Sequence, residues 1–279
     1  MTTEIFDRGN DTVVKCADFS LMQTLDCGQA FRFEKSGDMW QGVVGNDLLT
    51  MSQNGDEITF YDINKSDFLD KYYRYFTLDI DYSVLKSEFS KDKILAEAIK
   101  TAGGIRMLRQ DKWETICSFI ISQNNNIPRI KGIISRLCEN FGEKISGTDE
   151  YTFPSAEKIA KLTVDDLAPL RAGFRAKYII DAAEKTASHE VNLSALENMP
   201  LDEAKTELMK IKGVGPKVAD CALLFSCSHF DAFPMDVWMK RVMAVLYPDG
   251  LPKCAEKYRG IAQQYLFHYA RTIKLSDDE

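Results

Sequence analysis

The sequence predicts an α+β protein, with an N-terminal antiparallel β domain over residues 1–90 followed by a mostly α-helical region over residues 91–279. Short segments rich in β-branched and aromatic residues alternate with tight-turn residues in the first part. In the second part, apolar residues recur at helical spacing between residues that typically cap helices. The chain shows no repeat or linker, so the change near residue 90 is its one clear domain boundary.

Four segments of the N-terminal part are expected to form an antiparallel meander. They are FRFEK (31–35), MWQGVVG (39–45), LLTMSQ (48–53) and EITFYD (57–62). Tight turns are expected between them, at Ser36-Gly37-Asp38, Asn46-Asp47 and Asn54-Gly55. An aromatic stretch over residues 67–85 is expected to lead out of the meander through a helix and a loop.

The C-terminal part contains repeated helix signals. Pro128 can open one helix and Gly142 can end it. Ser155 and Thr163 are typical of helix N-termini, and Gly173 is expected to end the helix that Thr163 opens. Further helices are expected over residues 93–100, 112–123, 175–187, 202–211, 216–226, 237–247 and 254–272.

The most informative segment is a helix-hairpin-helix at about residues 202–226. Gly213, Val214 and Gly215 join its two helices and expose backbone N–H groups, as an anion such as a DNA phosphate requires. Lys217 lies in the first turn of the second helix, where the positive end of the helix dipole favours a neutral, nucleophilic amine. The motif therefore indicates a DNA-binding site with a reactive lysine.

Asp236 follows this motif within a Pro-Met-Asp-Val sequence. Its carboxylate could stabilise a cationic sugar, so that lysine and aspartate together suggest attack on a nucleotide. Purely structural interpretations exist: Gly213 as a C-cap, Pro216 as the first residue of a helix, Lys217 as a surface lysine and Asp236 as an N-cap. The functional interpretation is favoured because all the parts occur together at this spacing.

Residues 208–243 resemble the helix-hairpin-helix–Gly/Pro–Asp superfamily of DNA glycosylases. The resemblance implies that Lys217 is the Schiff-base lysine and Asp236 the catalytic aspartate. Three further segments resemble the 8-oxoguanine DNA glycosylase/AP lyase family within that superfamily. They are DCGQAFRF (26–33), RMLRQDKWETICSFIISQNNNIPRI (106–130) and GIAQQYLFHYA (260–270).

The family resemblance implies a pocket for an extruded base. The Gly28 carbonyl would accept a hydrogen bond from N7–H, which 8-oxoguanine has and guanine lacks. Gln263 would read the Watson–Crick edge, while Phe267 and Cys221 would lie on the two sides of the base. Cys221 is also one helical turn after Lys217, so thiol and amine can meet on one helical face, where a thiolate–ammonium pair would add a dipole that the lesion could sense.

Other residues are implied to contact the duplex. Asn124, Arg129 and Arg175 match residues directed at the cytosine left behind; the structural alternative is capping by Asn124 and surface exposure of the arginines. Phe174 replaces a tyrosine that usually wedges into the duplex. Trp238 replaces a histidine near a phosphate, where it could stack or donate through its indole N–H; with the hairpin residues it is expected to contact the DNA backbone.

Composition limits the class of protein. The N-terminus lacks an apolar signal core and no run of about eighteen apolar residues exists, so no membrane span and a cytoplasmic location are expected. Seven scattered cysteines predict neither disulfides nor a zinc site, and the C-terminal iron–sulfur loop of some relatives cannot form. No cofactor or metal is expected, and the three histidines lack ligand spacing.

The net charge of −7 argues mildly against nucleic acid, but basic residues gather around the motif and in two further groups. We therefore expect a monomer that binds double-stranded DNA containing 8-oxoguanine opposite cytosine, excises the base and incises the strand by β-elimination. Two alternatives stay open: a superfamily glycosylase for another damaged purine, such as an alkylated one, and a non-catalytic helix-hairpin-helix DNA-binding protein.

Overall fold

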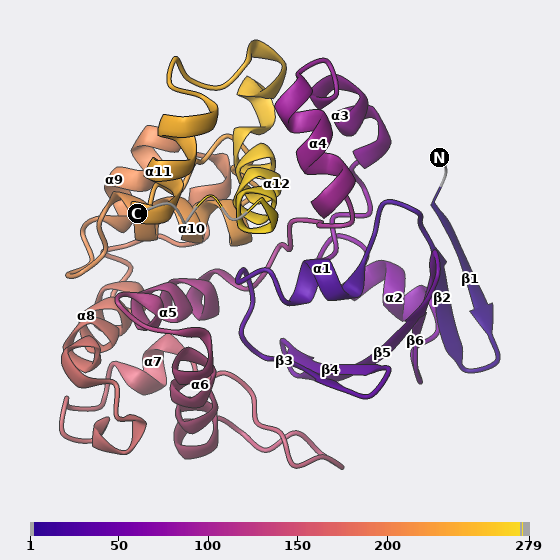
Figure 1. The fold of residues 1–279 in the computed structure, drawn as a ribbon. Coiled ribbons are helices and arrows are strands. Elements are labelled where there is room, and N and C mark those ends of the chain that lie inside the picture. The colour runs from indigo at the N-terminus through magenta and orange to yellow at the C-terminus, as the bar shows by residue number, and fades with distance from the viewer. Residues whose placement is uncertain (1–2, 274, 276–279) are drawn as a thin grey trace.

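The computed structural model describes residues 3–273 and 275. One six-stranded antiparallel sheet, in the order β1-β2-β6-β5-β4-β3, lies beside a larger helical part (Figure 1). The predicted α+β class, with a β part followed by helices, is confirmed.

The strands include the four that the sequence predicts and two more. The sheet comprises β1 (Glu4–Arg8), β2 (Asp11–Lys15), β3 (Phe33–Ser36), β4 (Met39–Val44), β5 (Asp47–Asn54) and β6 (Glu57–Phe60). The hairpin of β1 and β2 was not predicted, because its strands are short and β1 is charged at both ends. It turns at Gly9, whose φ of 68° is left-handed, and β2 buries Val13 and Val14 completely.

Two short helices cover the sheet, α1 (Leu21–Leu25) and α2 (Lys65–Lys71) (Figure 1). Phe60 on β6 packs against Phe68 of α2 and against Phe76 beyond it, with ring centroids 4.6 and 5.4 Å apart. These rings belong to an apolar core that extends from Val14 to Leu108. Apolar residues of the segment between β2 and β3 belong to this core, and the same segment supplies one wall of the site described below.

The helical part begins before residue 90. Its α-helices are α3 (Tyr82–Phe89), α4 (Lys93–Ala102), α5 (Lys112–Ser122), α6 (Ile127–Phe141), α7 (Ala156–Ile159), α8 (Ala176–Ala187), α9 (Leu201–Leu208), α10 (Pro216–Ser226), α11 (Val237–Leu246) and α12 (Arg259–Thr272). Short 3₁₀ helices are η1 (Ala168–Leu170), η2 (Gly173–Arg175), η3 (Leu196–Asn198) and η4 (Lys253–Tyr258). Apolar residues of α3 join the core of the helical part, and α12 packs on α4. The domain boundary near residue 90 stays a prediction.

One predicted helix is absent from the described structure. Thr163 and Asp166 do form reciprocal capping hydrogen bonds, but a turn and then η1 follow, instead of an α-helix. Arg171 ends η1 in a left-handed conformation, with φ of 54°. The prediction that Gly173 ends a helix is wrong, because Gly173 begins η2 and leads directly into α8.

A partly buried ion pair joins the β part to the helical part. Arg32 precedes β3 and its Nη1 lies 3.3 Å from Oε2 of Glu114 in the first turn of α5. Burial raises the pKa of Glu114 to about 7, although the Arg32 guanidinium opposes this shift. The folded state therefore favours the protonated carboxyl.

This pKa predicts that alkaline pH destabilises the fold. Because the pKa of Glu114 rises on folding from 4.5 to about 7, its contribution to the free energy of unfolding is lost as the pH increases through this range. The loss amounts to about 3 kcal/mol on a scale of about 1.4 kcal/mol for each pH unit. Urea unfolding from pH 5 to pH 8 should show the wild type losing stability relative to Glu114→Gln. Parallel stability curves would contradict the prediction.

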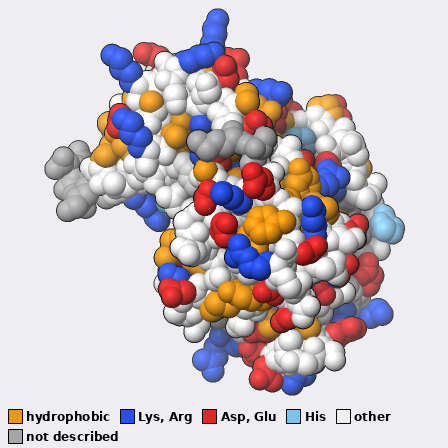
Figure 2. Space-filling view, turned by 90° about the vertical axis from the view of Figure 1, so that its right-hand side faces the viewer, with side chains coloured by type: hydrophobic (Ala, Val, Ile, Leu, Met, Phe, Trp, Pro, Cys, Tyr) orange, Lys and Arg blue, Asp and Glu red, His pale blue; other side chains and the backbone are white. Residues whose placement is uncertain are grey.

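No helix of the described residues is long and apolar enough to cross a membrane. Likewise, residues 3–273 and 275 contain no His, Cys, Asp and Glu cluster suited to a metal ion. On the face that includes β1 and α3, acidic and basic side chains are interspersed (Figure 2). This pattern is typical of a solvated surface rather than of a phosphate-binding patch.

Candidate active site

A cavity of about 270 Å³ lies where the loop after α1 meets α5, α10 and α12. Its lining residues run from Asp26 to Arg271, so it brings together segments that lie far apart in the chain. Among the lining residues are six that the sequence analysis singles out: Gly28, Lys217, Cys221, Asp236, Gln263 and Phe267. The predicted catalytic and base-recognition residues therefore share one cavity.

Lys217 reaches the cavity because the hairpin sets the start of α10. Gly215 is the N-cap and Pro216 the first helical residue, where its missing N–H costs no hydrogen bond. Lys217 follows, and its Nζ lies 5.5 Å from the centroid of the Phe119 ring. The ammonium therefore packs on an aromatic face inside the cavity rather than extending over the surface.

Asp236 is the cap of a helix and also lies at the cavity. It is the N-cap of α11, and its Oδ1 accepts a hydrogen bond of 2.7 Å from the backbone N–H of Met239. It also lines the cavity together with Lys217. Because the capping bond uses only Oδ1, the second carboxylate oxygen, Oδ2, can interact with a positive charge in the cavity.

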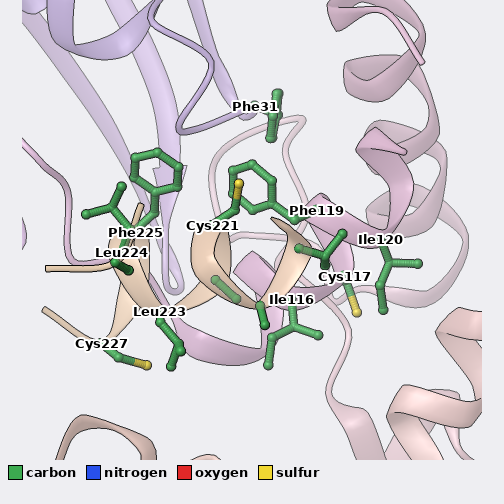
Figure 3. Packing of buried hydrophobic residues seen from close by; sticks show 14 of the residues in the cluster. Phe31, Ile116, Cys117, Phe119, Ile120, Cys221, Leu223, Leu224, Phe225 and Cys227 are labelled. Carbon is green, nitrogen blue, oxygen red and sulfur yellow. The ribbon is translucent and has the colours of Figure 1, made fainter. Parts of the chain in front are cut away.

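Aromatic rings and a thiol form the apolar wall of the cavity. Phe119 stacks on Phe225 with ring centroids 5.4 Å apart and meets Phe31 edge-on at 5.7 Å. Figure 3 shows Cys221 close to these rings, on the α10 side. Sequence reasoning missed Phe31, Phe119 and Phe225 as site residues, since aromatic residues within predicted strands and helices are usually core.

The Cys221 thiol and the Lys217 amine lie close together, as the sequence predicts, but the thiolate form of Cys221 is disfavoured. Burial raises the pKa of the Cys221 thiol to about 11, and the nearby Lys217 ammonium lowers it only in part. The side chain is therefore a neutral thiol at neutral pH. It lines the pocket as a small apolar surface on which a base can lie, and carries no charge that would form a thiolate–ammonium pair.

Gly28 lies in a loop conformation that requires glycine. Its φ is 83°, and a Cβ there would be strained although no atom lies within 4 Å of it. The loop is tied down because the Gln29 amide donates to the carbonyls of Thr24 and Arg106. The backbone of Gly28 is therefore held at the cavity; the direction of its carbonyl stays a prediction.

Helix α12 contributes the polar edge of the cavity. Gln263 and Gln264 are 4% and 6% exposed, and Nε2 of Gln264 donates to Oε1 of Gln263 at 2.7 Å. Phe267 lies one turn later and carries the guanidinium of Arg271 4.5 Å from its ring centroid. Gln264 and Arg271 also line the cavity and were missed by sequence reasoning, although their spacing from Gln263 and Phe267 could have indicated them.

The residues assigned to the opposite cytosine lie beside the cavity rather than in it. Arg175 is 2% exposed, and its guanidinium donates to the backbone carbonyls of Gln123, Asn124 and Ala172. Burial, and to a smaller extent the nearby Arg129, lowers its pKa. The structural alternative of an exposed Arg175 is therefore wrong: its guanidinium holds the loop that follows α5.

This loop has an unusual backbone conformation at Asn124, whose φ is 47°. Asn126, rather than Asn124, is the N-cap of α6, and its side chain accepts from the backbone N–H of Arg129. Asn124 is therefore not the capping residue, and its carbonyl is fixed by Arg175 at 2.9 Å. Asn124 thus lies in the loop that follows α5, and Arg129 lies in the first turn of α6.

Phe174 and the hairpin are connected through Tyr178. Phe174 is 49% exposed, and its ring centroid lies 5.9 Å from that of Tyr178. Gly213, with φ of 82°, approaches the same Tyr178 ring so closely that a Cβ on it would lie 2.4 Å from a ring carbon. Val214 is buried and Gly215 is the N-cap of α10, so the core and the start of α10 together hold the hairpin backbone in place.

Trp238 differs from its expected role. Its indole packs against the core of the helical part, and its Nε1 is buried without a hydrogen-bond partner among the described residues. The predicted phosphate contact through this N–H is therefore not available in the present conformation. The ring supports α11 and thereby the cap residue Asp236.

Comparison with known proteins agrees with this geometry. The family model for the 8-oxoguanine DNA glycosylase N-terminal domain matches residues 12–116. The model for the HhH-GPD superfamily of base excision DNA repair proteins matches residues 117–258. A Saccharomyces cerevisiae N-glycosylase/DNA lyase is 36% identical over 185 residues. This alignment covers 61% of the present chain and 49% of the yeast protein, so the chain spans about half the length of that relative.

Two solved structures are similar over almost the whole chain. MBOgg1 in complex with a low-affinity DNA ligand has a TM-score of 0.90 and 42% identity, covering 98% of this chain and all of that one. The Clostridium acetobutylicum 8-oxoguanine glycosylase/lyase, bound to double-stranded DNA containing cytosine opposite 8-oxoG, has a TM-score of 0.90 and 36% identity over the same shares. The chain thus belongs to the 8-oxoguanine DNA glycosylase family, within the helix-hairpin-helix base excision repair proteins.

Proposed function

We propose that the protein removes 8-oxoguanine from opposite cytosine in duplex DNA and then incises the strand, with Lys217 as nucleophile. The observation that carries this proposal is the cavity in which Lys217 and Asp236 lie together with Gly28, Cys221, Gln263 and Phe267. A base must leave the helix to reach such a cavity, at a cost of a few kcal/mol for unstacking. We further propose that the enzyme acts as a monomer, since one chain supplies all these groups.

The lysine accounts for both steps of the reaction. Lys217, neutral at the moment of attack, forms a bond from Nζ to C1′ while the bond from C1′ to the base breaks and its electron pair leaves with the base. Opening of the sugar ring then gives a protonated Schiff base. Loss of a proton from C2′ expels the 3′ phosphate, which incises the strand by β-elimination.

The other residues stabilise the charge on the sugar and contact the base. Asp236 stabilises the positive charge that develops on the sugar, because its carboxylate is fixed by the bond to Met239 before the substrate arrives. Phe267 and the neutral Cys221 thiol contact the two sides of the base. The Gly28 carbonyl accepts the N7–H that distinguishes 8-oxoguanine from guanine.

A borohydride-trapping assay tests the proposal directly. The wild-type protein should form a covalent adduct with a duplex that contains 8-oxoguanine opposite cytosine, and none with the same duplex containing guanine. A monofunctional glycosylase for alkylated purines would release its base without an adduct. A non-catalytic DNA-binding protein would do neither.

Arg129 is predicted to read the opposite cytosine. Arg129→Ala should reduce the preference for 8-oxoguanine opposite cytosine over the same lesion opposite adenine, by about 1–3 kcal/mol for a lost charge-assisted contact. Single-turnover excision of both duplexes measures this preference. Arg136→Ala is a matched control, because that arginine instead donates to the Leu170 carbonyl. Equal weakening of both pairings by Arg129→Ala would identify a phosphate contact and refute the reading role.

A further inference from the structure

The second glutamine of α12 has no role in the function proposed above, yet its environment is unusual. Gln264 is buried and lines the cavity beside Gln263. Its Nε2 donates to Gln263, whereas its Oε1 is buried and accepts no hydrogen bond among the described residues. Since an unmet buried acceptor destabilises a protein, a donor from outside the chain would complete this group.

The hydrogen bond between the two amides also fixes the orientation of Gln263. With its Oε1 held by Gln264, Gln263 presents Nε2 as a donor and keeps one further lone pair on Oε1 as an acceptor. Rotating both amides by half a turn would leave the N–H donors of Gln264 unmet instead of one acceptor. The observed orientation therefore leaves the Nε2 group of Gln263 as donor and the Oε1 atoms of both glutamines as acceptors at the polar edge of the cavity.

This arrangement complements one class of base. The Watson–Crick edge of a 2-amino-6-oxopurine has one acceptor, O6, and two donors, N1–H and the 2-amino group. We propose that Gln264 is a specificity residue of this enzyme: its Nε2 orients Gln263, and its Oε1 accepts from the 2-amino group of the extruded base. Adenine-derived bases lack that amino group and leave Gln264 unmet. The inference rests on the proposed function and names a further determinant of the same site.

The test compares two bases in the wild type. Duplexes carry either 8-oxoguanine or 8-oxohypoxanthine, which lacks only the 2-amino group, opposite cytosine. Single-turnover excision of 8-oxohypoxanthine should be roughly 5- to 150-fold slower, the range for one unmet buried polar group. Equal rates on the two bases would overturn the proposal without touching the glycosylase function. Failure to cut the 8-oxoguanine duplex at all would instead refute the proposed function.

Gln264→Met, which keeps the length of the side chain and removes the amide, assigns the effect to this residue. The variant should slow 8-oxoguanine excision and bring the rates on the two bases close together. A merely structural role would slow both bases equally and preserve their ratio, which would overturn the proposal. Gln41→Met on β4 should leave rates and ratio unchanged. Gln264→Met also loses the bond to Gln263, so its melting temperature is measured beside the two rates, and the wild-type comparison of the two bases does not depend on the variant.

Discussion

Lys217→Gln is expected to abolish both base release and covalent trapping while lesion binding is largely retained. The expected loss is complete for trapping, because Lys217 is the one lysine among the described residues that line the cavity. Glutamine is similar in length and keeps the packing on Phe119, so the cavity should keep its shape. Trapping with borohydride and a binding titration on an 8-oxoguanine duplex measure the two properties separately.

An exposed lysine provides the control for this experiment. Lys100 lies on α4, where it forms a surface ion pair with Glu97. Lys100→Gln should therefore trap at the wild-type level. Mapping the adduct of the wild type by mass spectrometry should identify Lys217, and an adduct on any other lysine would sink this assignment.

Asp236→Asn is expected to lower single-turnover excision by roughly 10²–10³-fold, the scale for removing one fixed stabilising group from an active site. Stability should scarcely change, because asparagine is as good an N-cap as aspartate and can still accept from the N–H of Met239. The variant therefore separates the two roles of this residue. Excision rate and melting temperature must be measured on the same preparation.

Asp236→Ala completes the comparison. Alanine removes the cap as well as the charge, so this variant should lose about 1 kcal/mol of stability in addition to the loss of excision. If Asp236→Asn excises 8-oxoguanine at nearly the wild-type rate, Asp236 only caps α11 and the catalytic role is refuted.

The sequence was sufficient for the parts of the site that depend on local structure. Helix signals at Pro216 and Asp236 set the starts of α10 and α11, and these starts place Lys217 and Asp236 in one cavity, whereas α9 ends at Leu208, before the expected C-cap Gly213. Likewise, the four predicted strands follow from alternation and turn residues within the chain itself. Such short-range signals do not depend on the rest of the fold.

The wrong predictions concern properties that only tertiary packing determines. Nothing in the local sequence shows that Cys221 is buried deeply enough to keep its proton, or that Arg175 is enclosed by three backbone carbonyls. The same reason explains the missed β1–β2 hairpin, since its stability comes from pairing with β6 rather than from its own residues. Burial and long-range pairing were therefore the information that the sequence alone lacked.

The contact of Tyr178 with both Phe174 and Gly213 has a consequence for how DNA is distorted. Phe174, the expected wedge residue, and the hairpin at Gly213, the expected phosphate-binding segment, are separated along the chain. Both nevertheless pack on the ring of Tyr178. Their spacing is thus set before DNA arrives, and little conformational entropy is lost in ordering one relative to the other. If a duplex contacts both Phe174 and the hairpin, as the family resemblance implies, its own backbone would have to adapt to that span.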